Sequence, residues 1–122
     1  MTQEEKKLLI KDLCARVPYG MFVHHKNVNQ DYNLIAVFDD GRIGVTTLKE
    51  NIGLTPTSIN ECKPYLRPIS SMTEDEKESF HKLKVYKHND CKDWYNSHHL
   101  DDRGLIEKGL ALEAPEGMYK TE

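Results

Sequence analysis

The Asp40-Gly41 pair is the feature that most restricts how this chain can fold, because it lies between two runs of β-forming residues. The first run covers residues 32–38 and the second covers residues 42–48. A tight hairpin turn needs positive φ angles, which Gly and Asp tolerate. The sequence therefore predicts an antiparallel hairpin. Apolar residues on both faces of its first strand indicate that its centre is covered on both sides.

A helix is predicted at the start of the chain. Thr2 and Glu5 have the spacing of a capping box, in which each side chain binds the backbone N–H of the other residue. Pro18 disfavours a helical backbone in the residue before it, so the helix is expected to end near Arg16 or Val17. Its apolar side carries Leu8, Leu9, Leu13 and Cys14, and its polar side carries Lys6, Lys7, Lys11 and Asp12.

The remaining segments predict short strands and two further helices. Strands are expected at residues 21–25 and 58–60, with a helical turn at residues 61–63 and an edge strand at residues 65–67. Residues 109–112 are expected to form a last strand or a docked turn. The edge position follows from the flanking prolines, which cannot donate to a sheet ladder. A second capping box, Thr73 with Glu76, begins a second helix. Asp93 is expected to cap a third helix over residues 94–100, with Trp94 and Leu100 as its anchors.

These elements place the chain in the α+β class. The sheet is expected to be small and antiparallel, with three to five short strands, and an SH3-like or other barrel-like form fits this pattern. The N-terminal helix and the two later helices would pack on it. The length of 122 residues fits a single domain spanning residues 1–122, with residues 113–122 as a flexible C-terminal tail.

The composition indicates the cellular compartment and excludes some classes of binding partner. Acidic residues number 20 and basic residues 17, without a basic block, so nucleic acid is not an expected partner. No apolar run approaches the roughly 20 residues that cross a bilayer, and the polar, acidic N-terminus does not resemble a secretory signal. We therefore expect a soluble cytoplasmic protein that has no contact with membranes.

Cysteine and histidine are present without a metal-binding pattern. The three cysteines, Cys14, Cys62 and Cys91, are widely spaced and form no Cys-x-x-Cys pair. Adjacent histidines, as in His24-His25 and His98-His99, do not chelate one metal well, because neighbouring side chains point to different faces of a strand or helix. We expect no metal and no cofactor. The lysine beside Cys62 is a weak indication of a lowered thiol pKa.

The densest polar constellation is the group His98, Asp101 and Arg103, which also includes His99 and Asp102. A histidine near carboxylates and an arginine can support acid–base catalysis or hold an anion. The alternative is a polar helix end, in which these side chains bind the last carbonyls and one another. We favour the helix end. If the group is a site, its side chains should converge in a concave pocket.

Aromatic residues suggest a third possibility. Tyr19, Phe22, Tyr32 and Phe38 can present stacking surfaces on a small sheet, as in proteins that bind single-stranded nucleic acid. No basic stripe accompanies them, so a role in the core or in a protein contact is favoured.

Three stretches together resemble a group of small proteins of anaerobic gut bacteria and their mobile elements. These are residues 4–20, residues 61–74 (ECKPYLRPISSMTE) and residues 98–115 (HHLDDRGLIEKGLALEAP). Where similar proteins tend to have an aromatic residue after the histidine pair, this chain has Leu100. The group has no established activity, so the resemblance implies a real domain and no particular chemistry.

The sequence thus favours an interaction or accessory module without catalytic machinery, which presents a sheet edge and residues 64–72 to another protein. No nucleophile elbow and no glycine-rich phosphate loop is present. An enzyme or anion-binding protein using His98, Asp101 and Arg103 is one alternative. A nucleic-acid-binding small barrel is another. The sequence predicts neither the partner nor the oligomeric state.

Overall fold

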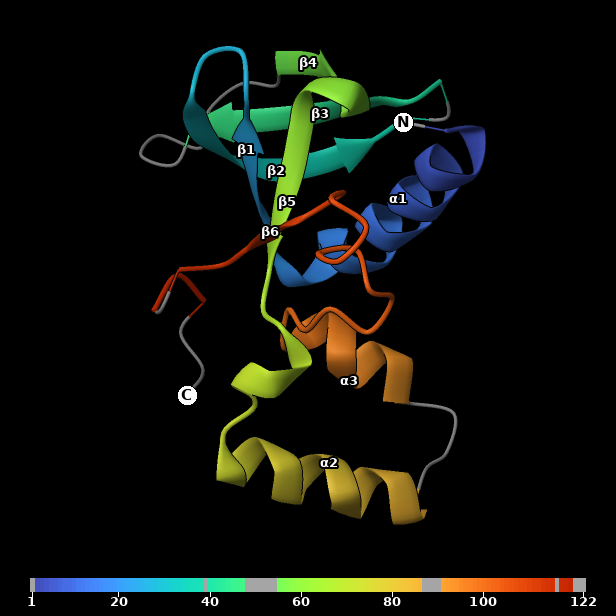
Figure 1. The fold of residues 1–122 in the computed structure, drawn as a ribbon, viewed down its shortest axis with the longest axis vertical. Coiled ribbons are helices and arrows are strands. Elements are labelled where there is room, and N and C mark those ends of the chain that lie inside the picture. Colours follow the sequence, from blue (N-terminus) through green and yellow to red (C-terminus); the bar gives the residue numbers. More distant parts are fainter. Residues whose placement is uncertain (1, 39, 48–54, 87–90, 116, 120–122) are drawn as a thin grey trace.

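In the computed structural model, a curved sheet forms one end of the molecule and two helices form the other (Figure 1). The structure describes residues 2–38, 40–47, 55–86, 91–115 and 117–119, but not the side chains of residues 84–86 and 91–93. Most of the connection expected after the hairpin therefore lies outside the described part. The cap expected at Asp93 is wrong, because the third helix already begins at Cys91 and Asp93 lies inside it. The predicted α+β class with a small sheet is confirmed, but among the described residues the sheet is open and not barrel-like, has six strands where three to five were expected, and contains one parallel pair.

Within the described residues the sheet has six strands in the order β4-β3-β2-β1-β5-β6. The strands are β1 (Phe22–His25), β2 (Gln30–Val37), β3 (Arg42–Thr47), β4 (Thr55–Ser58), β5 (Cys62–Leu66) and β6 (Leu112–Glu113). All pairs are antiparallel except β5 with β6. His25 Nε2 of β1 lies 3.1 Å from Thr57 Oγ1 of β4, although β2 and β3 separate these strands. The open sheet is therefore strongly curved.

The predicted hairpin is confirmed. Val37 of β2 pairs with Ile43 of β3, and the Phe38 N–H donates to the Arg42 carbonyl at 2.9 Å. The prediction that the hairpin is covered on both of its faces is wrong for β2, where Leu34 is buried but Ile35 is 38% exposed. Successive side chains of a strand point to opposite faces, and the core lies against only one of them here.

The strand β5 corrects two expectations, because residues 61–63 were expected as a helical turn and residues 65–67 as an edge strand. The 3₁₀ turn η2 (Ile59–Glu61) comes earlier, and β5 lies between β1 and β6. Pro64 is tolerated there because β1 pairs with β5 up to Pro64, whereas β6 pairs only with Tyr65 and Leu66. The missing N–H therefore faces no second ladder.

The helix α1 (Gln3–Arg16) has the predicted capping box. Glu5 N–H donates to Thr2 Oγ1 at 3.0 Å, and Thr2 N–H donates to Glu5 Oε1 at 2.9 Å. Two assignments of its faces are wrong, since Cys14 is exposed whereas Asp12 is fully buried. Asp12 tolerates burial because Arg16, one turn later on the same face, binds it.

The other two helices form a separate layer below the sheet (Figure 1). The helix α2 (Glu74–Tyr86) packs on α3 (Cys91–Ser97) through Phe80, whose ring centroid lies 5.0 Å from that of Trp94 and 4.9 Å from that of Tyr95. The third helix was expected to reach residue 100 but ends at Ser97. His99 has a φ of 61°, which no helix interior accommodates.

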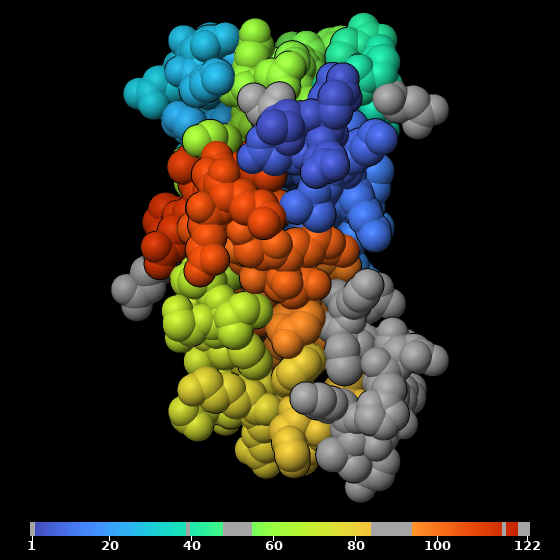
Figure 2. Space-filling model, turned by 45° about the vertical axis from the view of Figure 1, so that its right-hand side comes forward, coloured from blue at the N-terminus to red at the C-terminus, as the bar shows by residue number. Residues whose placement is uncertain are grey.

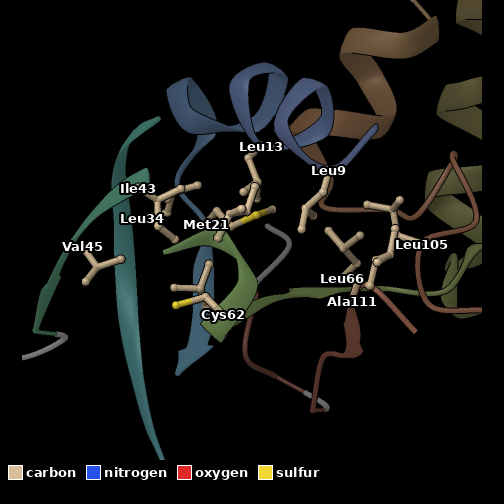
Figure 3. Close-up of a cluster of buried hydrophobic side chains, with 13 residues drawn as sticks. Leu9, Leu13, Met21, Leu34, Ile43, Val45, Cys62, Leu66, Leu105 and Ala111 are labelled. Carbon is tan, nitrogen blue, oxygen red and sulfur yellow. The ribbon is translucent and has the colours of Figure 1, made fainter. Parts of the chain in front are cut away.

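The core lies between α1 and the concave face of the sheet (Figure 3). Leu9 and Leu13 project from α1 toward Met21, Leu34 and Ile43, and all of these side chains are buried. The segment that follows α3 extends this core, with members Leu105, Leu110 and Ala111. The helix and the segment after α3 thus share one apolar interior with the sheet.

Gly41 in the hairpin turn provides a test of the local fold. Its φ is +87°, and an added Cβ would lie 2.6 Å from Lys6 Cε. We expect Gly41→Ala to lower the free energy of unfolding by about 1–2 kcal/mol, measured by urea denaturation, because an L side chain is strained at this φ. The flexible Lys6 side chain can move away from the added Cβ. Gly41→Ala should therefore cause most of the same loss in stability when it is made in a Lys6→Ala background. An unchanged urea midpoint in Gly41→Ala would contradict the turn.

Candidate functional site

The distinctive stretches 61–74 and 98–115 meet below the sheet. Arg67 and Leu100 form a parallel β-bridge, in which the Arg67 N–H donates to the His99 carbonyl at 2.7 Å and the Asp101 N–H donates to the Arg67 carbonyl at 2.8 Å. Figure 2 shows the segment after α3 (orange) between α1 (dark blue) and the segment after β5 (lime). These two segments and the end of α1 build the candidate site.

Arg67 ties the helical layer to this junction. Its guanidinium donates Nη1 and Nη2 to the two carboxylate oxygens of Glu76 in α2, at 2.8 and 2.6 Å, and Nη1 also donates to the His98 carbonyl at 3.1 Å. Glu76 Oε1 in addition accepts from the Thr73 N–H at 2.9 Å, which completes the predicted second capping box. The bonds from Arg67 and the Thr73 N–H lower the pKa of Glu76 to about 2.

A buried group of charges lies on the other side of the junction, and we call it the Arg16 network. It consists of Asp12, Arg16, Asn96, Asp102 and Arg103. Arg16 Nε donates to Asp12 at 2.9 Å, and Nη2 donates to the Leu100 carbonyl at 2.7 Å and to Asp102 Oδ1 at 3.1 Å. Arg103 Nη1 donates to the second Asp12 oxygen at 2.7 Å.

Burial sets the energetics of this network. The side chains of Asp12 and Arg16 are both 0% exposed. Burial raises the pKa of the Asp12 carboxyl above its usual range, and the two guanidiniums oppose that effect. Buried charges persist only where partners replace the lost water, and here each Asp12 oxygen has its own arginine. The network therefore fixes α1 against the segment after α3.

The structure gives each predicted site residue a different partner. His98 Nδ1 lies 2.8 Å from the Trp94 carbonyl, and its ring stacks on Trp94. Both Asp101 oxygens accept backbone N–H groups, those of Leu105 at 2.8 Å and Ile106 at 3.0 Å. Arg103 points to Asp12 in the Arg16 network. The three side chains line no common hollow among those described.

A hollow of about 410 Å³ lies beside Asp101, and we call it the acidic hollow. It is lined by residues 68–70, Asp101, Asp102, Gly104, Ile106 and Glu107. Pro68, Ile69 and Ile106 provide apolar surface, and Ile69 is 40% exposed. Three carboxylates and no described cation complete the lining. The hollow thus combines residues from both distinctive stretches.

Two of these carboxylates keep acceptor capacity. Asp102 uses only Oδ1 for its described bonds to Arg16 and Arg103, which leaves Oδ2 available. Glu107 is exposed, and none of its described contacts is a hydrogen bond or an ion pair. Each Asp101 oxygen already accepts one backbone N–H. A bound group that donates hydrogen bonds would therefore meet Asp102 and Glu107 first.

A second hollow, of about 290 Å³, lies at the start of β1, and we call it the aromatic hollow. It is lined by residues 19–22, Asn33, His99, Met118 and Tyr119. Tyr119 comes from the expected tail and is packed, not free. Its ring stacks on His99 and Phe22, and its hydroxyl donates to the Tyr65 carbonyl at 2.8 Å and accepts from the Phe22 N–H at 3.0 Å. Burial raises the pKa of Tyr119.

His99 is a polar residue of this hollow. The sequence did not indicate that His99 and its neighbour His98 have different surroundings. Burial, with the nearby Arg16 charge, lowers the pKa of His99 to about 4, so the ring is neutral at pH 7. Its Nδ1 is buried without a hydrogen-bond partner among the described residues. The sequence gives little indication that His99 lines a hollow, because its ring packs against Tyr119, which is 20 positions away.

His24, His25 and Cys62 have structural partners. His24 Nδ1 lies 2.8 Å from Asp31 Oδ1, which also accepts from the Tyr65 hydroxyl at 2.7 Å. Burial raises the pKa of the Cys62 thiol to about 11, which is opposite to the lowering suggested by its lysine neighbour. In the described ranges, no group of three or more His, Cys, Asp or Glu side chains is arranged to hold a metal ion.

Comparison with family models, with curated proteins and with solved structures finds no match. Among the helices described, none combines the length and the apolar character that a bilayer crossing needs. The two hollows and the residues that line them are therefore the features from which a function can be inferred.

Proposed function

We propose that this chain is a non-enzymatic interaction module whose acidic hollow binds an arginine side chain of a partner protein. The observation that carries the proposal is the lining, which has apolar walls and three carboxylates and, among the described residues, no cation. The carboxylates would attract a guanidinium, while the walls would pack on its methylene stem.

The charge balance around the hollow supports a cationic ligand. The lining and the network beside it hold the carboxylates of Asp12, Asp101, Asp102 and Glu107, against the guanidiniums of Arg16 and Arg103. Both arginines are already engaged with Asp12 and Asp102. An additional cation therefore meets an excess of negative charge, whereas a phosphate or another anion meets repulsion.

Hydrogen-bond geometry favours arginine over lysine. The available acceptors, Asp102 Oδ2 and Glu107, belong to two separate carboxylates. A planar guanidinium has five N–H donors in a fixed fork and can bridge two such groups, whereas an ammonium acts as a point charge. This refines the sequence-based proposal, in which residues 64–72 meet a partner, because residues 68–70 form one wall of the hollow.

Fluorescence anisotropy with a labelled pentapeptide tests the proposal. One probe carries a central arginine between aliphatic residues, and the other carries citrulline, a neutral side chain of nearly the same shape. We expect the arginine probe to bind about fivefold tighter, the equivalent of roughly 1 kcal/mol for a partly exposed charge pair. Added salt should reduce this difference.

The variant Glu107→Gln should remove most of the preference for arginine, and Ile69→Ser should weaken binding of both probes. Glu113→Gln is the matched control, because Glu113 is exposed in β6 and does not line the hollow. Equal binding of the two probes, or an unchanged preference in Glu107→Gln, would refute arginine recognition at this hollow.

A further inference from the structure

The aromatic hollow is lined by aromatic rings, a surface that suits a flat molecule. Phe22 and Tyr119 stack with an interplanar angle of 11°, and Tyr119 and His99 stack with an angle of 12°, so three rings share nearly one orientation. Tyr19 adds a fourth ring that is 42% exposed. A volume of about 290 Å³ fits one small ring system. Flat rings stack favourably on such surfaces.

The lining carries no formal charge. Its described members are tyrosine, phenylalanine, methionine, glycine and asparagine residues together with His99. An ion bound here would lose its water without gaining a counter-charge, which is costly. The ligand class is therefore neutral, and a nucleotide is disfavoured because its phosphate would find no cation in this lining.

Two polar groups in the hollow have no hydrogen-bond partner among the described residues. The Asn33 side-chain amide makes no described hydrogen bond, and it offers one donor and one acceptor side by side. His99 Nδ1 is enclosed and unpaired, which leaves Nε2 as the ring nitrogen that a bound molecule can reach. A partly buried amide without a partner is matched best by a ligand edge that also carries a donor beside an acceptor.

We propose that the aromatic hollow is a separate small-molecule site for a neutral, planar heterocycle. One edge of this ligand carries a hydrogen-bond donor beside an acceptor, as a cyclic amide does, and a free nucleobase is an example. The ring of the ligand lies on the aromatic surface of Tyr19 and Phe22, and its amide edge pairs with Asn33. His99 Nε2 supplies a further hydrogen bond. This site is independent of the acidic hollow, because the two share no lining residue.

An NMR titration of the full chain with uracil tests the proposal. We expect the amide signals of Gly20, Phe22 and Asn33 to shift with saturation. The matched ligand is 1,3-dimethyluracil, which keeps the ring but lacks both N–H donors. It should bind at least about fivefold more weakly than uracil, which is the effect of losing one hydrogen bond of roughly 1 kcal/mol. Uridine monophosphate should bind no tighter than uracil.

Two variants connect the binding to the hollow. Asn33→Ala should weaken uracil binding about tenfold, which corresponds to roughly 1.4 kcal/mol. Asn27→Ala is the matched control, since Asn27 is exposed outside the hollow. If Asn33→Ala does not fold, Tyr19→Ala replaces it, and it should weaken both ligands alike. Absence of saturable shifts at these three amides, or equal binding of uracil and its dimethyl derivative, would overturn the proposal.

Discussion

Arg16→Met is expected to lower the free energy of unfolding by about 3–5 kcal/mol, because it removes one partner from a fully buried ion pair. Asp12 would keep Arg103 but lose the bond to Arg16 Nε, and the Leu100 carbonyl and Asp102 would each lose a donor. The loss is a large share of the roughly 5–15 kcal/mol that stabilises a domain. Urea denaturation followed by circular dichroism measures it.

Arg16→Lys and Arg42→Met are the companion variants. Lysine keeps the charge but cannot reproduce the separate bonds made by Nε and Nη2, so its loss should be intermediate. Arg42 pairs with Asp40 on the surface, where its side chain is 61% exposed, and Arg42→Met should change stability little. A comparable loss in the Arg16→Met and Arg42→Met variants would contradict a special role for the buried network.

Glu76→Gln is expected to reduce stability by roughly 3 kcal/mol at pH 7, since the pKa of Glu76 falls from 4.5 to about 2 on folding. The pKa is lower in the folded protein, so this contribution is fully present above pH 4.5 and is lost as the pH falls toward 2. Urea denaturation of the wild type between these pH values should show the loss, and the variant should show a flatter profile.

Glu74→Gln serves as the control for this prediction. Glu74 also lies in the first turn of α2, but its side chain is 91% exposed and its partner is Lys77 on the same helix. Its replacement should leave the pH profile of stability unchanged. A wild-type profile as flat as that of Glu76→Gln would show that the Arg67–Glu76 pair does not hold α2 to the rest of the protein.

The sequence predicted the features that depend on neighbouring residues. The capping boxes at Thr2 and Thr73 and the turn at Asp40-Gly41 each need only a few residues in a fixed order. Local spacing therefore determines them, and the α+β class follows from the elements that they delimit. The buried pair of Asp12 and Arg16 also has a local signal, because residues four apart share a helix face.

The candidate site could not be predicted in the same way. Arg16 binds Asp102, 86 positions away, and Arg67 binds the backbone of residues 98 and 99. These pairings depend on how the chain packs after α3. Ile69 and Glu107 looked like ordinary surface residues, and only their position around one hollow gives them a role. His98, which only the alternative enzyme interpretation used, packs on Trp94, and its Nδ1 lies 2.8 Å from the Trp94 carbonyl.

The most direct test of the proposed function is to map where an arginine derivative binds. Acetyl-arginine methylamide would be titrated into the full chain while backbone amide signals are followed by NMR. We expect saturable shifts at Ile69, Asp102 and Glu107, which line the acidic hollow, and no shifts along β4 at the sheet edge. Shifts that cluster on β4, or the same shifts with the citrulline derivative, would contradict it.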